Sequence, residues 1–120
     1  MLDANALILL LELDERVLGR ASQCFGGDLC LSAIAYAEVV RGTAIGKAPA
    51  RDLLEQAIQT IPVLPFDQAA AHRYAQLPFR RHRFDRLVAA HALVLDLTLV
   101  TANTTDFADL PSLRVEDWMR

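Results

Sequence analysis

Five polar side chains in this sequence belong to the residue types that bind divalent cations. They are Asp3, Glu38 and Asp85, with Asn103 and Asp106 in one polar loop. Carboxylate and amide oxygens without a neighbouring His or Cys favour Mg²⁺ or Mn²⁺ over zinc. A cation held by several carboxylates activates water and clamps a phosphodiester for in-line attack. If the fold brings these positions together, the chemistry they indicate is phosphodiester hydrolysis.

The stretch 84–107 carries three of these positions. It predicts a nearly all-apolar helix with Asp85 in its first turn, then a short buried strand over 97–100, then the loop that holds Asn103 and Asp106. Ligand sites of open α/β sheets gather at the carboxyl ends of the strands. An acid at the mouth of the helix and a loop just past the strand are therefore expected to meet.

Short apolar runs alternate with helical patterns along the rest of the chain. This pattern predicts an α/β fold, a three-layer sandwich in which a central, mainly parallel β-sheet is flanked by helices. The expected strands are the start of the chain, 29–31, 61–64, 97–100 and an edge strand within 113–118. At 120 residues and 53% hydrophobic content, we expect residues 1–120 to form a single domain.

The expected helices begin with polar caps or prolines and end at glycines or prolines. They cover a segment after Asp3 that includes the apolar run 6–11, then 14–24 (closed by Gly26 and Gly27), 33–41 (ended by Gly42), a segment opened by Pro49, and 67–77. In the 14–24 helix, Val17, Leu18, Ala21 and Phe25 share one face. In the helix opened by Pro49, the buried face is predicted to be Leu53, Leu54, Ala57 and Ile58.

Each acid also has a purely structural interpretation. An Asp between a strand and a helix, such as Asp3, is usually an N-cap, and Glu38 could extend from its helix to solvent. Against this, Glu38 is flanked by apolar residues, and a buried charge requires a partner, a proton or a metal. Several carboxylates in one pocket repel each other unless a cation neutralises them.

The charge distribution is uneven. Twelve Lys and Arg against 15 Asp and Glu give a net charge of −3, which argues against binding nucleic acid mainly through bulk electrostatics. The basic side chains crowd into one region. They are His72, Arg73, Arg80, Arg81, His82, Arg83 and Arg86. This patch suits a phosphate backbone or an acidic peptide, and the plain alternative is a solvated surface.

The two cysteines, Cys24 and Cys30, lack the spacing of a zinc or redox motif and are expected to be free thiols. The apolar run after Asp3 is too short for a membrane span and has no basic leader. We therefore expect a cytoplasmic protein without a membrane partner.

Several blocks resemble one family in the same order along the chain. They are Met-Leu-Asp-Ala-Asn at the start, Leu-Ser-Ala-Ile-Ala-Tyr-Ala-Glu-Val-Val-Arg-Gly, Val-Leu-Pro-Phe-Asp, Phe-Asp-Arg-Leu-Val-Ala-Ala-His-Ala-Leu, Leu-Val-Thr-Ala-Asn-Thr-Thr-Asp-Phe and Leu-Arg-Val-Glu-Asp-Trp. Together they look like a PIN-domain ribonuclease of the VapC toxin family, and the similarity covers essentially the whole chain.

The resemblance implies a PIN fold and a Mg²⁺-dependent endoribonuclease, with Mn²⁺ as a substitute. It also implies the toxin half of a type II toxin and antitoxin pair, dimeric and silenced by a small VapB-like partner. Position by position, the family acids fall on Asp3, Glu38 and Asp85. The fourth falls on Asn103, with Asp106 as a supplementary ligand.

This chain departs from the family pattern at three places. Asn103 is an amide where an acid is expected, Ala4 stands where many relatives have Thr, and the segment 78–84 before Asp85 is short and rich in arginine. One metal is then expected rather than two. These departures keep open an alternative, a weakened PIN domain that binds RNA or a protein without cutting.

The remaining polar residues receive expected roles from their positions. Asn5 is expected to orient Asp3 or a water, and Ser32 to cap a helix or donate to the site. His91 is expected to be a core histidine. Arg80, Arg81, Arg83 and Arg86 are candidates for holding RNA phosphates, since Arg offers two parallel donors. No aromatic stacking platform for single strands is expected, because the aromatic residues Tyr36, Tyr74 and Trp118 are assigned to core or interface.

Overall fold

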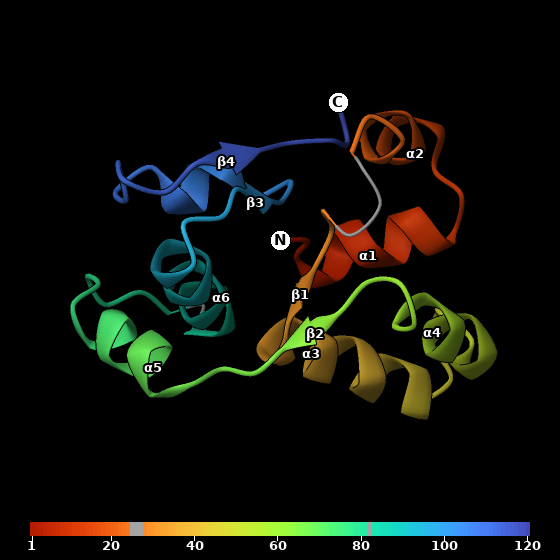
Figure 1. Cartoon of the computed structure of the whole chain (residues 1–120), viewed down its shortest axis with the longest axis horizontal. Coiled ribbons are helices and arrows are strands. Elements are labelled where there is room, and N and C mark those ends of the chain that lie inside the picture. Colours follow the sequence, from red (N-terminus) through yellow and green to blue (C-terminus); the bar gives the residue numbers. More distant parts are fainter. Residues whose placement is uncertain (25–27, 82) are drawn as a thin grey trace.

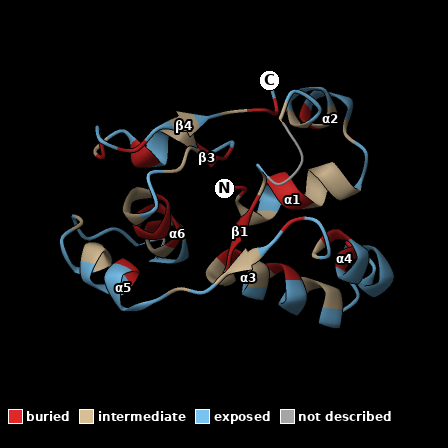
Figure 2. Cartoon of the chain, in the orientation of Figure 1, coloured by how far each residue is buried: buried red, intermediate tan, exposed pale blue. Residues whose placement is uncertain are grey.

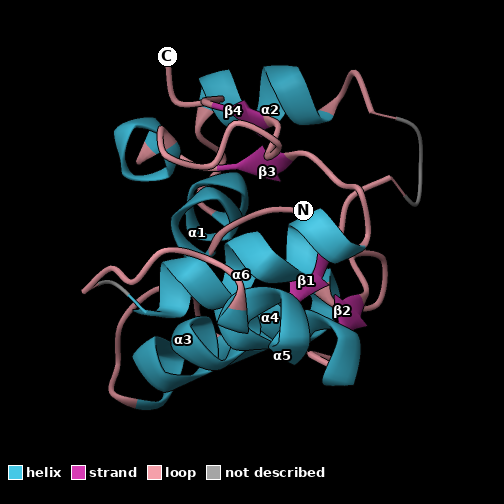
Figure 3. Ribbon diagram, turned by 90° about the vertical axis from the view of Figure 1, so that its left-hand side faces the viewer, coloured by secondary structure: helices cyan, strands magenta, loops and turns pink. Residues whose placement is uncertain are grey.

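Leu2 joins two pairs of short parallel strands into one sheet. The computed structural model describes residues 1–24, 28–81 and 83–120. In it β1 (Leu31–Ser32) pairs with β2 (Val63–Leu64), and β3 (Leu99–Val100) pairs with β4 (Val115–Glu116), both parallel. Leu2 forms parallel bridges to Leu31 and to Val100, and the N-terminus lies between the two strand pairs (Figures 1 and 3). The sheet order is therefore β2, β1, Leu2, β3, β4, all parallel as predicted.

Aspartates begin three of the helices. Asp3 accepts from the Ala6 amide at 2.8 Å, Asp67 accepts from the Ala70 amide at 3.0 Å, and Asp14 caps the second helix in the same way. Each cap satisfies backbone donors that a helix start leaves unpaired. The helices are α1 (Ala4–Leu11), α2 (Glu15–Ala21), α3 (Ala33–Ala44), α4 (Arg51–Ala57), α5 (Gln68–Ala75), α6 (Arg83–Val94) and the 3₁₀ helix η1 (Thr104–Phe107).

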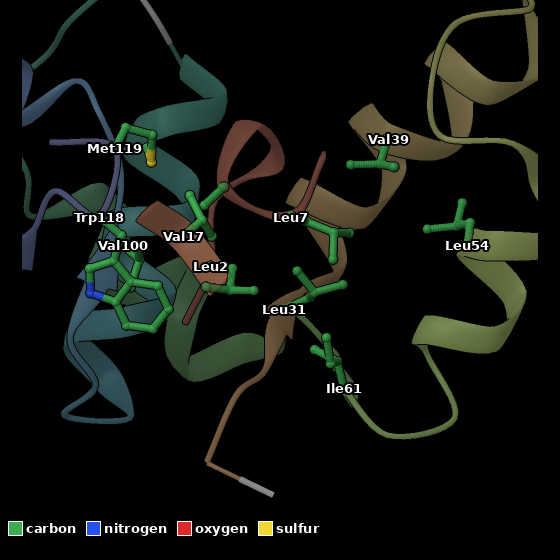
Figure 4. Close-up of a cluster of buried hydrophobic side chains, with 11 residues drawn as sticks. Leu2, Leu7, Val17, Leu31, Val39, Leu54, Ile61, Val100, Trp118 and Met119 are labelled. Atoms are coloured by element: carbon green, nitrogen blue, oxygen red, sulfur yellow. The ribbon is translucent and has the colours of Figure 1, made fainter. Parts of the chain in front are cut away.

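The two faces of the sheet are covered by different sets of helices, and only α3 contributes a buried side chain to both among the described residues. Leu2, Leu31 and Val100 lie in one buried cluster with side chains of α1, α2 and α4 and with Val39 of α3 (Figure 4). Their preceding neighbours Met1, Cys30 and Leu99 lie in a second cluster, with Val88, Ala89 and Ala92 of α6. Successive side chains of a strand point to opposite faces, so the two clusters are the two core layers. The predicted three-layer α/β sandwich is confirmed.

The helix α6 is the most deeply buried helix of the second layer. Figure 2 shows it mainly in red, whereas α4 and α5 show exposed faces. The helix α5 packs against it. The apolar composition of 84–96 thus predicted the burial of 88–92 correctly, whereas Phe84 and Leu95 near the two ends are exposed.

Several predicted boundaries were wrong. Each strand has only two paired residues, and α3 continues through Gly42 to Ala44. The left-handed conformation that glycine tolerates occurs instead at Gly46, with φ of 88°. Leu53 is 46% exposed although it was assigned to a buried face, because the seven-residue α4 buries only Leu54 and Ala57.

The predictions for Phe25, Gly26 and Gly27 lie outside the described residues. Both cysteines are free thiols, as expected, and Cys30 is buried. Within the ranges that the structure describes, no helix has the length and apolar character needed to cross a membrane.

Candidate active site

Asp3 directly follows Leu2, which holds the central position of the sheet. Asp3 takes part in both the sheet and helix α1. Its amide donates to the Val100 carbonyl at 3.0 Å, and its carboxylate caps α1. The buried Thr101 hydroxyl donates to the same carboxylate and accepts from the Asn103 amide at 3.1 Å. Thr101 therefore links the first acid to the loop after β3, a contact that sequence analysis missed although Thr101 directly follows the strand.

Glu38 and Asp85 line one hollow of about 490 Å³. Glu38 comes from the middle of α3 and Asp85 from the first turn of α6, and the two helices pack against each other. Arg81, Arg83 and Phe84 complete the lining. The hollow thus combines two acids, two guanidinium groups and one aromatic ring.

The three acids influence each other's ionisation. Burial raises the pKa of Asp3 above its ordinary value, and the nearby Asp85 and Asp117 raise it further, while the bonds from Thr101 and Ala6 oppose the shift. Burial also raises the pKa of Glu38, with further contributions from Asp85 and Asp3. The carboxylates are therefore close enough for mutual repulsion. The contribution of Asp117 was not expected from the sequence.

This donor set fits a hard divalent cation. Three carboxylates and an amide offer only oxygen ligands, which suits Mg²⁺ or Mn²⁺. In the described part of the chain, however, no three His, Cys, Asp or Glu side chains converge into a ready-made metal-binding group. Binding a cation would draw the side chains of Asp3, Glu38 and Asp85 closer together, since it would neutralise their repulsion.

Replacement of Glu38 by Gln is expected to stabilise the protein at pH 7 without divalent cations. The folded-state pKa of Glu38 is raised, so its contribution to stability is present below the ordinary value of 4.5 and is lost as pH rises through the raised pKa. The gain is expected to stay below about 1 kcal/mol, because solvent screens the exposed part of the side chain. Chemical denaturation at pH 7 and pH 4 measures it.

The exposed Glu55→Gln on α4 is the matched control for Glu38→Gln and should change the free energy of unfolding little. A Glu38→Gln protein that is less stable than the wild type at pH 7 would contradict the expected repulsion among the acids.

The loop after β3 places Asn103 and Asp106 differently. Asn103 precedes η1, is exposed, and makes no side-chain capping bond. Asp106 is also exposed and lines a second hollow of about 240 Å³ together with Asp85. The two residues therefore border the same hollow, and the supplementary role of Asp106 stays a prediction.

Arg86 is buried and connects α6 to this loop. It is only 3% exposed, and its Nη2 donates to the Asp106 carbonyl at 3.0 Å and to Asp109 Oδ1 at 2.8 Å. The hydrogen bond from Arg86 lowers the pKa of Asp109. Arg86 was expected to hold RNA phosphate, and that role stays a prediction. Its Nη2 is engaged within the fold, whereas its Nη1 has no hydrogen-bond partner among the described residues. Arg86 fixes the position of η1 relative to Asp85.

Replacement of Arg86 by Lys is expected to reduce kcat about 10-fold to 100-fold, the range for groups that orient metal ligands. Lysine keeps the charge, but its side chain is shorter, so its ammonium does not reach the position of Nη2, the atom that contacts both the Asp106 carbonyl and Asp109. The KM for RNA should change little, since Arg86 is buried. Steady-state kinetics with a short RNA measures both parameters.

The control for Arg86→Lys is Arg16→Lys, because Arg16 pairs with Asp14 in an exposed ion pair at 3.2 Å. An increase in KM without a change in kcat in the Arg86 variant would contradict the positioning role and indicate that Arg86 contacts RNA directly.

Of the other arginines of the basic patch, Arg80, Arg81 and Arg83 are exposed and Arg73 is half-buried. Arg81 and Arg83 line the hollow with Glu38 and Asp85, while Arg80 lies 3.6 Å from Asp109. His82 lies outside the described residues. Three guanidinium groups thus border the acids on one side.

The predicted supporting residues fall into two groups. Asn5 is exposed and lines a hollow with Glu38 on the α1 side, and its expected role of orienting Asp3 or a water stays a prediction. Ser32 caps α3, as expected, and its hydroxyl lies 2.8 Å from His91 Nδ1. Burial lowers the pKa of His91, and this residue is the core histidine that was expected.

The fold and the acids at the carboxyl edge of its parallel sheet define a PIN domain. The family model described as PIN domain matches residues 1–113, and the chain belongs to this family. It belongs to the VapC group within it: it is 31% identical to the tRNA(fMet)-specific endonuclease VapC of Shigella flexneri, over 98% of this chain and 96% of that protein.

Two solved structures support the same grouping. The fold matches VapBC-1 from nontypeable Haemophilus influenzae with a TM-score of 0.79 and 27% identity, covering 100% of this chain and 98% of that one. It matches the DNA-bound VapBC from Salmonella typhimurium with a TM-score of 0.82 and 30% identity, covering 98% and 96%. The resemblance inferred from the ordered blocks is therefore confirmed.

Proposed function

We propose that this protein is a Mg²⁺-dependent endoribonuclease and the toxin of a type II toxin and antitoxin pair. The observation that carries the proposal is the grouping of Asp3, Glu38 and Asp85, whose carboxylates perturb one another at the edge of a parallel sheet. The VapC relatives, one of which is named for cleavage of a tRNA, support RNA as the substrate. The site of action would be the cytoplasm.

Asp3, Glu38 and Asp85 would hold the cation, with Asn103 adding an uncharged oxygen and Asp106 a supplementary one. When bound, the cation supplies charge neutralisation and activation of water. Thr101 holds Asp3 in place, and Arg86 holds the loop of Asn103 and Asp106 against α6. Arg81 and Arg83, which line the same hollow, would bind and orient the RNA phosphates.

The proposed partners are a small VapB-like antitoxin and a second copy of the chain. The solved relatives from Haemophilus influenzae and Salmonella typhimurium are VapBC complexes, which supports an antitoxin partner. Co-expression with the product of a small neighbouring gene should relieve any growth arrest caused by this chain, and size-exclusion chromatography with light scattering gives the stoichiometry.

The proposed activity is tested with purified protein and a structured RNA. Cleavage should occur with Mg²⁺ or Mn²⁺ and stop when EDTA is added. Cleavage that persists in EDTA would overturn the role of the metal. If the pure protein binds RNA but leaves it intact with either metal, and its induction does not arrest growth, the weakened, non-cleaving PIN domain suggested by the Asn103 amide becomes the better function.

A further inference from the structure

Two phenylalanines shortly before Asp85 in the sequence are exposed to solvent. Phe84 is 60% exposed and Phe79 is 75% exposed. No stacking platform was expected from the sequence, and the helix that begins near Phe84 was expected to be buried. The structure corrects this, since the first turn of α6 projects beyond the core. Rings this exposed contribute little to the core, and exposed apolar side chains that lie together mark interaction sites.

The residues around Phe84 indicate which kind of ligand could stack on its ring. It immediately precedes Asp85 and lines the same hollow as Asp85, Glu38, Arg81 and Arg83. An aromatic face supplies stacking energy to a flat π-system, and adjacent guanidinium groups attract an anion. A partner with flat rings and regularly spaced negative charges matches this arrangement.

The neighbouring Phe79 extends the surface. The Arg83 guanidinium carbon lies 5.8 Å from the centroid of the Phe79 ring, a cation–π arrangement. Arg83 is thereby kept close to the hollow, where it can reach a phosphate. Phe84 differs from Phe79 because it lines the hollow of the acids directly.

We propose that Phe84 stacks on an unpaired base next to the scissile phosphate of RNA, while Arg81 and Arg83 bind the flanking phosphates. This proposal rests on the proposed function and gives its substrate class as single-stranded or looped RNA. A base within a duplex is stacked on both sides, so its face cannot meet the Phe84 ring. Stacking on Phe84 would select an unpaired base over a paired one. It would not select a particular base, since every base has a π-face.

The experiment measures RNA binding without cleavage. A fluorescein-labelled hairpin RNA is titrated in EDTA with the wild-type chain, Phe84→Ala, Phe84→Trp and the control Leu95→Ala, whose side chain is exposed just beyond the other end of α6. We expect Phe84→Ala to weaken binding about 5-fold to 100-fold, the range for loss of one stacked base. Phe84→Trp and Leu95→Ala should bind like the wild type.

A second measurement identifies the stacked base. Hairpins with one abasic ribose at each loop position are titrated in turn. At one loop position, removing the base should weaken binding to the wild type as much as Phe84→Ala weakens binding of the intact RNA. Phe84→Ala should then bind that abasic RNA no more weakly than it binds the intact RNA. Unchanged binding by Phe84→Ala, or additive losses at every position, would overturn the proposal.

Two further outcomes separate the possible explanations. If Phe84→Ala changes the association state in sedimentation equilibrium but leaves RNA affinity per chain unchanged, the ring is a contact between copies and the stacking proposal fails. Phe84-dependent binding by a protein that never cleaves RNA supports stacking and refutes the endoribonuclease. If Phe84→Ala cleaves RNA with the same metal-dependent kcat/KM as the wild type, the stacking proposal fails and the endoribonuclease proposal stands.

Discussion

Replacement of Asp85 by Asn should abolish metal-dependent RNA cleavage while leaving the fold intact. Asp85 lies in the first turn of α6 and lines two hollows, one together with Glu38 and the other together with Asp106. Asn keeps the shape of the side chain but removes its charge. Charge stabilisation by a bound cation contributes several kcal/mol, and we therefore expect a loss of about 10³-fold in kcat/KM.

The matched control for Asp85→Asn is Asp52→Asn, because Asp52 is an exposed acid in the first turn of α4. Both substitutions remove an acid from the first turn of a helix, which costs roughly 0.5 kcal/mol. In Asp85→Asn, the relief of repulsion with Asp3 and Glu38 opposes this cost. Only Asp85→Asn should lose activity. Thermal unfolding of both variants verifies the fold, and full cleavage by a folded Asp85→Asn protein would remove this residue from the site.

Magnesium should stabilise the folded protein substantially. The raised pKa values of Asp3 and Glu38 show that their charges are unfavourable in the absence of a cation. At a free Mg²⁺ concentration of about 100 times the Kd, binding to the folded state alone adds about 2.7 kcal/mol. For a domain of this size, that corresponds to a Tm increase of roughly 10 °C.

Two controls accompany the magnesium measurement. NaCl at matched ionic strength reports general charge screening, and Asp85→Asn reports binding elsewhere on the surface. Equal Tm shifts in the wild type and in Asp85→Asn would contradict a cation site at Asp85. The Tm increase should also shrink as pH falls toward the raised pKa values of the acids, because protons compete with the cation.

Features determined by neighbours in the sequence were predicted well. Asp3, Ser32 and Asp67 were expected to cap helices and do so, because a capping side chain reaches only two or three residues along the chain. The layer order followed from the alternation of apolar runs and helical patterns. The family resemblance indicated which of the acids were candidate site residues, namely Asp3, Glu38 and Asp85.

Features that depend on tertiary contacts were not predictable in the same way. Arg86 resembles its exposed neighbours in the sequence, and only the fold brings Asp109, 23 positions away, to its guanidinium. The exposure of Phe84 depends on how far α6 extends beyond the core. The role of Thr101 requires Asp3 and β3 to lie side by side, although about a hundred residues separate them.

The position of Leu2 has a consequence for hydrogen exchange. Its amide donates to the Cys30 carbonyl at 2.9 Å, and the Asp3 amide donates to the Val100 carbonyl on the opposite side. Neither amide can exchange with solvent through fraying of a sheet edge, since strands cover both sides. Their exchange rates should therefore report global unfolding, and the first acid should stay in place during the local opening events that expose outer segments such as β4.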